Sequence, residues 1–205
     1  MRPTLVVPLL LALAAPLRAQ QPPGDSIVFS LLPTSRLEVR TGKTGLLGFA
    51  GHEHDIRARD FAGRVVYVPA APEDSHVEIT IATAGLEVLT PPDSEEIRKV
   101  TQVMRTDVLD AARYPEIRFA SRAARLMPHG FHLVADLTMH GHTERIPVDV
   151  FVATTGDTLR AHATFSVAQT RFGITPYRGG PGGTVRVADR VDFTIDAVAV
   201  RTAQP

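Results

Sequence analysis

The chain has 205 residues, of which 44% are hydrophobic and 21% are charged, so its composition is that of an ordinary globular protein. It contains no cysteine, which excludes a disulfide framework, a thiolate zinc site, an iron–sulfur cluster and a cysteine nucleophile. The 22 basic and 22 acidic residues give a formal net charge of zero, so no basic field exists to attract nucleic acid, and we expect no nucleic acid partner.

Residues 1–19 have the layout of a secretory signal peptide. Arg2 provides a positive start, residues 5–15 form an apolar run, and the small residue Ala19 precedes Gln20. The run is too short for a transmembrane helix, which needs about 20 apolar residues, and no later stretch qualifies. We therefore expect export, cleavage after Ala19, a mature chain without a transmembrane segment, and a periplasmic or secreted protein.

From Ser26 onward the main signal is alternation of apolar and polar residues, which predicts half-buried strands. One apolar face per strand favours an antiparallel sheet. The predicted strands lie at 27–31, 36–40, 61–68, 76–81, 116–119, 131–140, 146–152, 159–167 and 191–199. Turns are predicted at 41–43, 69–72, 128–130 and 156–157.

One segment has helical spacing instead. Asp93 is a candidate N-cap with Glu96 three residues later, and apolar residues then recur at intervals of three and four. This pattern predicts one amphipathic helix over residues 94–111, ended by Tyr114 and Pro115. A single helix in an antiparallel chain predicts a barrel or sandwich with the helix over one end.

The predicted inward faces carry several alanines among larger apolar residues. These are Ala135, Ala161, Ala163, Ala197 and Ala199. Small side chains can fit where strands crowd together, or they can leave room for one small ligand inside an eight-stranded barrel. Because these faces carry no charge, a ligand held inside would be apolar.

Catalytic signatures are scarce, so we expect a protein that is not an enzyme and requires no cofactor. The sequence has no GxSxG elbow, no Walker phosphate loop and no HExxH motif. Two pairs of histidines, His52 with His54 and His140 with His142, are each two residues apart. On a strand each pair would share a face, so together the pairs could bind a transition metal. The alternative is that they are solvated or hydrogen-bonded residues of turns and barrel rims.

Several segments occur in an order that resembles the YceI-like polyisoprenoid-binding family. They are Phe61-Ala62-Gly63, the strand 77–81, Val108-Leu109-Asp110, the segment 113–121 (RYPEIRFAS), the segment 135–143 (ADLTMHGHT), Arg171-Phe172-Gly173-Ile174 and the closing strand 189–195. The Tyr-Pro-x-Ile-x-Phe-x-Ser part is the most specific, and the resemblance extends from about residue 35 to residue 200.

This resemblance implies an all-β chain with one helix, folded as an antiparallel, lipocalin-like β-barrel of eight or so strands with the amphipathic helix packed at one end. It also implies an elongated apolar cavity for an isoprenoid lipid, of the polyprenyl or isoprenoid quinone type, and no established catalytic residues. The expected organisation is a signal peptide at 1–19, a leader and first strand at 20–34, and a YceI-like β-barrel domain at 35–202.

Three hypotheses follow for function. The first is a periplasmic or secreted barrel that buries an isoprenoid lipid, its partner. The second is a metal-binding or metal-dependent protein that uses the two histidine pairs, and the third is a purely structural or interaction protein. For the first hypothesis, the candidate residues lining the cavity are Phe131, Leu133, Leu137, Met139, Ala163, Phe165, Phe193 and Ile195.

Overall fold

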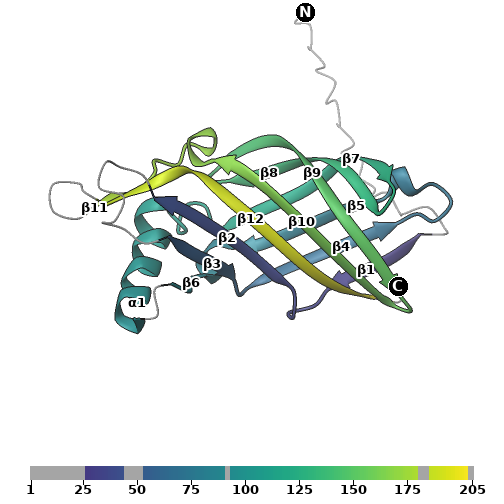
Figure 1. Cartoon of the computed structure of the whole chain (residues 1–205), viewed down its shortest axis with the longest axis horizontal. Helices are drawn as coiled ribbons and strands as arrows, with labels where there is room; N and C mark the ends of the chain where they lie inside the picture. The colour runs from purple at the N-terminus through teal and green to yellow at the C-terminus, as the bar shows by residue number, and fades with distance from the viewer. Residues whose placement is uncertain (1–25, 44–52, 91–92, 180–184, 203–205) are drawn as a thin grey trace, which may run out of the picture.

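The computed structural model describes residues 26–43, 53–90, 93–179 and 185–202, which form a long barrel with a helix at one end (Figure 1). Every strand pairing in the barrel is antiparallel, as predicted. In chain order the strands are β1 (Ile27–Leu31), β2 (Arg36–Lys43), β3 (His54–Ala58), β4 (Phe61–Tyr67), β5 (His76–Ala82), β6 (Leu86–Val88), β7 (Glu116–Met127), β8 (Gly130–Met139), β9 (His142–Thr155), β10 (Thr158–Ala168), β11 (Arg178–Gly179) and β12 (Val185–Arg201).

The barrel closes because the long last strand pairs with both β1 and β2 along one edge. β12 pairs with β2 between Val187 and Asp196 and with β1 between Ala199 and Arg201, while its other edge pairs with β10. The ring therefore runs β1–β4–β5–β7–β8–β9–β10–β12 and returns to β1. This arrangement confirms the predicted eight-stranded antiparallel barrel.

Three of the barrel strands are bent, so each is divided into two segments. β1 leads into β2 across residues 32–35, β3 leads into β4 across Arg59–Asp60, and β5 leads into β6 through the 3-10 turn η2 (Thr83–Gly85). At the first bend the Ser35 hydroxyl accepts a hydrogen bond from the Val198 N–H and donates one to the Val198 carbonyl, both at 3.0 Å. The Val198 carbonyl also accepts from the Leu32 N–H at 2.8 Å, so it is the Val198 N–H whose acceptor the Ser35 side chain supplies.

Beyond these bends the sheet opens between β6 and β7. Among the described strands β6 pairs with β3 alone, and the helix α1 (Ser94–Val103) packs against it. The Thr101 hydroxyl accepts a hydrogen bond from the Val88 N–H at 3.1 Å, and the Arg105 guanidinium donates to the Leu86 carbonyl at 2.6 and 2.8 Å. The helix therefore supplies partners for a strand edge that would otherwise be unpaired.

The helix begins where the sequence predicts and ends earlier. The Asp93 carboxylate caps it by accepting from the Glu95 and Glu96 N–H groups at 2.8 and 2.9 Å. After Val103 the chain forms a π-helical turn, η3 (Met104–Val108), and Asp110 then adopts a φ of 43°. This left-handed residue ends the helical path before the predicted limit at residue 111. No helix in the described ranges is long and apolar enough to cross a bilayer.

The predicted inward faces are confirmed for most strands. Leu37, Leu133 and Leu137 are buried, and the odd-numbered residues of β8, β10 and β12 point into the barrel. β7 departs from this rule because an extra residue, Arg122, lies between Ser121 and Ala123 in the pairing with β8. This bulge changes the inward phase from odd-numbered residues to even-numbered ones.

The turns at 69–72, 128–130 and 156–157 lie where they are predicted, but the predicted turn at 41–43 is wrong. Residues 41–43 are the last part of β2, and Thr41 pairs with His54 on one side and Val191 on the other. The glycine and lysine in this stretch resemble a turn sequence, yet both neighbouring strands supply hydrogen-bond partners, so the strand continues. Thr41 is consequently a buried inward-facing residue.

We expect Thr101→Val to destabilise the fold by about 1–3 kcal/mol, because the buried Val88 N–H would lose its acceptor without a change in side-chain shape. Chemical denaturation of the wild type and the variant, with the midpoint and slope fitted for each, would measure the change in the free energy of unfolding. The control is Thr106→Val, on the exposed side of the same helical segment, where the hydroxyl donates to the Gln102 carbonyl. Equal losses of stability in the two variants would contradict the proposed edge-capping role.

Candidate functional site

Two cavities occupy the barrel interior. The helix-end cavity, of about 750 Å³, lies between β2, β3, β6, β12 and the α1–η3 segment. The hairpin-end cavity, of about 620 Å³, lies between β1, β4, β5, β7, β8, β9, β10 and β12. Each volume falls within the roughly 300–1,000 Å³ that is usual for a small-molecule site.

The two cavities meet end to end. Their shared wall residues are Leu37, Ile81, Ile117, Phe193 and Ile195, which come from β2, β5, β7 and β12. All of these side chains are apolar, so the boundary between the cavities contains no charge or hydrogen-bonding group. The interior therefore holds two adjoining cavities along the barrel, with an apolar wall in common.

Aromatic rings line the middle of this space. The rings of Phe165 on β10 and Phe193 on β12 stack with centroids 4.7 Å apart and planes 6° apart, and Phe119 on β7 lies 6.5 Å from Phe165. Phe165 and Phe193 are direct partners in the β10–β12 register, so the sheet itself holds the stack. This part of the wall is rigid and offers flat apolar surfaces to a ligand.

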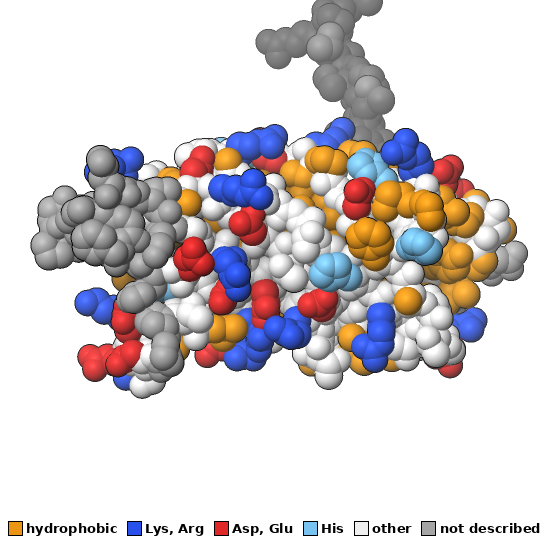
Figure 2. All heavy atoms as spheres, in the orientation of Figure 1, with side chains coloured by type: hydrophobic (Ala, Val, Ile, Leu, Met, Phe, Trp, Pro, Cys, Tyr) orange, Lys and Arg blue, Asp and Glu red, His pale blue; other side chains and the backbone are white. Residues whose placement is uncertain are grey.

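The hairpin-end cavity reaches the protein surface at the tips of the β7–β8 and β9–β10 hairpins. Its wall includes Leu126, Pro128 and Gly156 at these tips, and Leu126 is 54% exposed. Phe151 on the outer face of β9 is 53% exposed. In Figure 2, hydrophobic side chains gather toward this end of the molecule, opposite α1.

The helix-end cavity differs because its mouth is charged. The lining carboxylates are Glu38, Asp93, Glu95 and Glu96, and the lining cations are Lys99 and Arg186. Hydrogen bonds from the backbone N–H groups of Glu96 and Glu95 hold the pKa of Asp93 below its ordinary value. The Glu38 carboxylate is paired with Arg57 at 2.8 Å, so the remaining charges of both signs nearly balance, and the mouth offers an anion no excess of positive charge.

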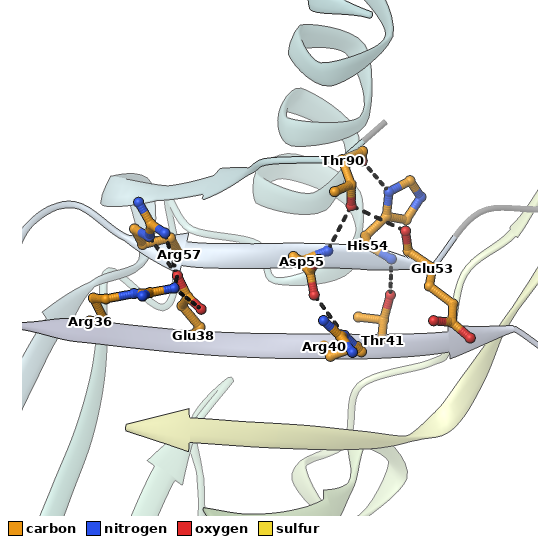
Figure 3. Close-up of polar contacts among 9 residues, drawn as sticks. All are labelled: Arg36, Glu38, Arg40, Thr41, Glu53, His54, Asp55, Arg57 and Thr90. Atoms are coloured by element: carbon orange, nitrogen blue, oxygen red, sulfur yellow. Dashed lines mark hydrogen bonds and ion pairs between the residues drawn. The ribbon is translucent and has the colours of Figure 1, made fainter. Parts of the chain in front are cut away.

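A network of polar contacts fixes the start of β3 at this mouth (Figure 3). The Thr90 hydroxyl accepts from the Asp55 N–H at 2.9 Å, and the Thr90 carbonyl lies 2.7 Å from His54 Nδ1. On the outer face the Arg40 guanidinium donates to the Asp55 carboxylate at 2.8 Å, and this bond raises the pKa of Arg40. The network holds β2 and β3 together where the barrel opens.

All the candidate lining residues predicted from the sequence face these cavities. Met139 borders the helix-end cavity, while Phe193 and Ile195 border both cavities. The hairpin-end cavity is bordered by Phe131, Leu133, Leu137, Ala163 and Phe165. That these side chains contact a ligand stays a prediction.

Some of the inward alanines leave room for a ligand, and others fit where strands crowd together. Ala161, Ala163 and Ala197 border the hairpin-end cavity, so their small side chains leave room. Ala135 and Ala199 are fully buried and border neither cavity, so they fit where the wall is crowded. The sequence alone could not separate these cases because both place a small residue on the same face.

Two polar residues of the wall, Thr41 and Gln169, were missed by the sequence analysis. Both are 8% exposed, and both border the helix-end cavity. Thr41 continues the inward phase of Leu37 and Val39, so extending that alternation by one residue would have found it. Gln169 lies in the 3-10 turn η4 (Gln169–Phe172), where no sequence periodicity marks the inward side.

One of the two histidine pairs, His140 with His142, does not form the shared face that the metal hypothesis requires. His140 and Gly141 are the two turn residues between β8 and β9, with φ values of 48° and 76°, so His140 and His142 do not follow one another along a strand. His52 lies outside the described residues. Within the described residues, no group of three or more His, Asp or Glu side chains could hold a metal ion.

His140 is held in its turn by packing. Its ring lies 4.4 Å from the Tyr114 ring, centroid to centroid, and its Nδ1 atom is buried without a hydrogen-bond partner in the described structure. His142 lies close to Gly173 on the neighbouring turn. The turn position of His140 agrees with the alternative explanation, but its Nδ1 atom is neither solvated nor hydrogen-bonded to a described residue, as that explanation expected.

Comparison with known proteins agrees with this geometry. A UPF0312 protein of Pseudomonas putida strain GB-1 is 29% identical over 150 residues, which cover 68% of this chain and 71% of the relative. The crystal structure of Burkholderia cenocepacia BcnA matches with a TM-score of 0.64 and 23% identity, over 81% of this chain and 96% of BcnA. A polyisoprenoid binding domain from Saccharophagus degradans, implicated in plant cell wall breakdown, matches with a TM-score of 0.60 and 11% identity, over 85% and 98% of the two chains.

The family assignment rests on the sequence as well as on the fold. The model of the YceI-like domain matches residues 34–199, which include the whole barrel from β2 onward except the last residues of β12. Apart from β1 and the last residues of β12, the strands that line the two cavities lie within this range. The chain therefore belongs to the YceI-like family.

Proposed function

We propose that this protein binds an isoprenoid lipid in the elongated interior of its barrel. The observation that carries the proposal is the pair of apolar cavities that share Leu37, Ile81, Ile117, Phe193 and Ile195. Two adjoining apolar cavities in a row suit a linear prenyl chain better than a compact ligand. The description of the Saccharophagus degradans domain as polyisoprenoid-binding supports the same ligand class.

Burial of the chain provides the binding free energy. Removing apolar surface from water is worth roughly 25 cal/mol per Å², so each prenyl unit that enters adds to the affinity. Association and ordering of the flexible chain offset part of this gain. The stacked rings of Phe165 and Phe193 are already fixed by strand pairing, so little ordering of the wall is needed.

The proposed role is binding rather than catalysis. A nucleophilic enzyme would need a hydroxyl or thiol beside a general base in the cavity. The buried polar residues of the described wall, Thr41 and Gln169, instead contact backbone groups of His54 and Ala188. We propose further that residues 1–19 direct export, so the protein would meet its lipid in the periplasm or outside the cell.

The direct test is native mass spectrometry of the mature protein purified from the export compartment, followed by organic extraction of what dissociates. We expect a discrete added mass that extracts as a prenyl lipid. Protein that arrives without lipid and does not take up added prenyl lipids would overturn the proposal. A stoichiometric metal ion in place of lipid would favour the histidine hypothesis instead.

Ala163→Phe should lower the amount of retained lipid about tenfold or more, because the ring would project into the hairpin-end cavity beside Ile195. The fold should survive, since the ring enters open space. The matched control is Thr164→Phe, the same change at the adjacent exposed position of β10. Lipid retention that is equal in both variants, with equal thermal stability, would count against the cavity as the binding site.

Export predicts a defined mature N-terminus. N-terminal sequencing of the protein from the periplasm or medium should begin at Gln20, because Ala19 provides the small residue before the cleavage site. A full-length chain beginning at Met1 in the cell interior would refute the export proposal. That result would leave the lipid-binding proposal unchanged.

A further inference from the structure

Two buried polar side chains stand out in an otherwise apolar interior. Thr41 on β2 and Gln169 in η4 both border the helix-end cavity. They lie on opposite sides of the same stretch of β12, since Thr41 pairs with Val191 and the Gln169 side chain bonds to the Ala188 carbonyl. Such buried groups usually fix the orientation of a ligand in an apolar pocket.

Each of these residues keeps hydrogen-bonding capacity after its contacts are counted. The Thr41 hydroxyl accepts from the His54 N–H at 3.3 Å, and among the described residues its own proton has no hydrogen-bond acceptor. Gln169 Nε2 donates to the Ala188 carbonyl at 2.8 Å, and Oε1 has no partner among the described residues. His54 adds an acceptor to the same cavity wall, because Nδ1 must carry the proton that bonds to the Thr90 carbonyl, so Nε2 of the neutral ring is an acceptor, and it has no hydrogen-bond partner among the described residues.

The charges at the mouth of the helix-end cavity affect which kind of lipid headgroup can bind there. Apart from Glu38, which is paired with Arg57 at 2.8 Å, three lining carboxylates lie with two lining cations at this mouth. A phosphate or diphosphate would therefore lose its hydration without meeting an excess of positive charge. An uncharged hydroxyl avoids this cost. It can also accept from the Thr41 hydroxyl and donate to Gln169 Oε1 or His54 Nε2.

The opposite end of the barrel lacks an equivalent arrangement. The polar residues that line the hairpin-end cavity are mainly exposed, such as His129 and Thr154. Tyr67 and Ser75 are partly buried there, and the Ser75 hydroxyl, like that of Thr41, accepts from a backbone N–H, that of Val68 at 3.0 Å. Among the described residues that line the cavities, the two ends differ in burial, because the polar side chains buried as deeply as Thr41 and Gln169 line the helix-end cavity and not this one. A headgroup at this end would therefore bind polar groups that are less shielded from water.

We propose that the lipid binds in one direction, with an uncharged, hydroxyl-bearing headgroup in the helix-end cavity beside Thr41, Gln169 and His54, and with its prenyl tail in the hairpin-end cavity. This assignment rests on the proposed lipid-binding function and adds the headgroup class and the orientation. The Phe165–Phe193 stack then contacts the chain rather than the headgroup.

The test compares three probes with the same chain, namely geranylgeraniol, its deoxy hydrocarbon and geranylgeranyl phosphate, by displacement of a fluorescent polyene from the mature protein. The readout is the ratio of alcohol affinity to hydrocarbon affinity in each variant. Because the hydration of each probe is the same for every variant, it cancels when ratios are compared. The hydrocarbon affinity also reports whether a variant still has an intact barrel.

We expect Gln169→Met and Thr41→Val each to lower this ratio by roughly two- to tenfold, the value of one lost hydrogen bond, at unchanged hydrocarbon affinity. Thr41→Ser keeps the hydroxyl and should keep the ratio. Thr154→Val makes the matched change at the other end and should have no effect. The phosphate should bind more weakly than the alcohol.

The possible failures are distinguishable. If none of the probes binds the wild-type protein, the proposed function fails, and this assignment fails with it. If the probes bind but the ratio stays constant in the helix-end variants, or falls only in Thr154→Val, lipid binding stands and the orientation is wrong. Tighter binding of the phosphate than of the alcohol would overturn the uncharged headgroup.

Discussion

The structure depends on one constraint, which is that every backbone N–H and carbonyl of a sheet needs a partner. A barrel meets this need by closing, and β12 closes this one by pairing with both halves of the bent β1–β2 strand. The backbone groups of β6 also need partners where β6 separates from β7. There Thr101 and Arg105 take the place of a strand, so the barrel can hold an open, charged mouth without a bare edge. The helix is therefore part of the wall as well as a cover.

An open mouth is useful only if the interior is not filled, and the side chains of the wall leave it unfilled. Ala161, Ala163 and Ala197 stand where larger residues would have completed a solid core. The large residues that are present, Phe119, Phe165 and Phe193, are held against the wall by contact with one another. Stability thus comes from the closed ladder and the wall packing, and the space in the centre remains available for a ligand.

Much of this architecture was accessible from the sequence because alternation depends only on neighbouring residues. It correctly predicted which side chains of β8, β10 and β12 point inward, and the Asp93 cap correctly predicted the start of the helix. Alternation was misleading wherever the local structure depends on a partner strand that is distant in the sequence. Thr41 continues a strand through a turn-like sequence because β3 and β12 flank it, and His140 leaves its strand because a two-residue turn requires a positive φ there. The buried polar role of Gln169 depends on a contact with Ala188, which no local pattern contains.

The bulge in β7 affects how this protein can change in length during evolution. Arg122 is an extra residue opposite the regular β8 ladder, so Ser121, Ala123 and Ala124 would alternate normally without it. A deletion there would cost the contact between Arg122 and Asp136 but would keep both apolar faces in phase. A deletion in the middle of β10 would instead turn half of its inward side chains to solvent. Apart from this bulge, insertions are better tolerated at the β9–β10 tip, where a side chain on Gly156 would meet no neighbouring atoms within 4 Å.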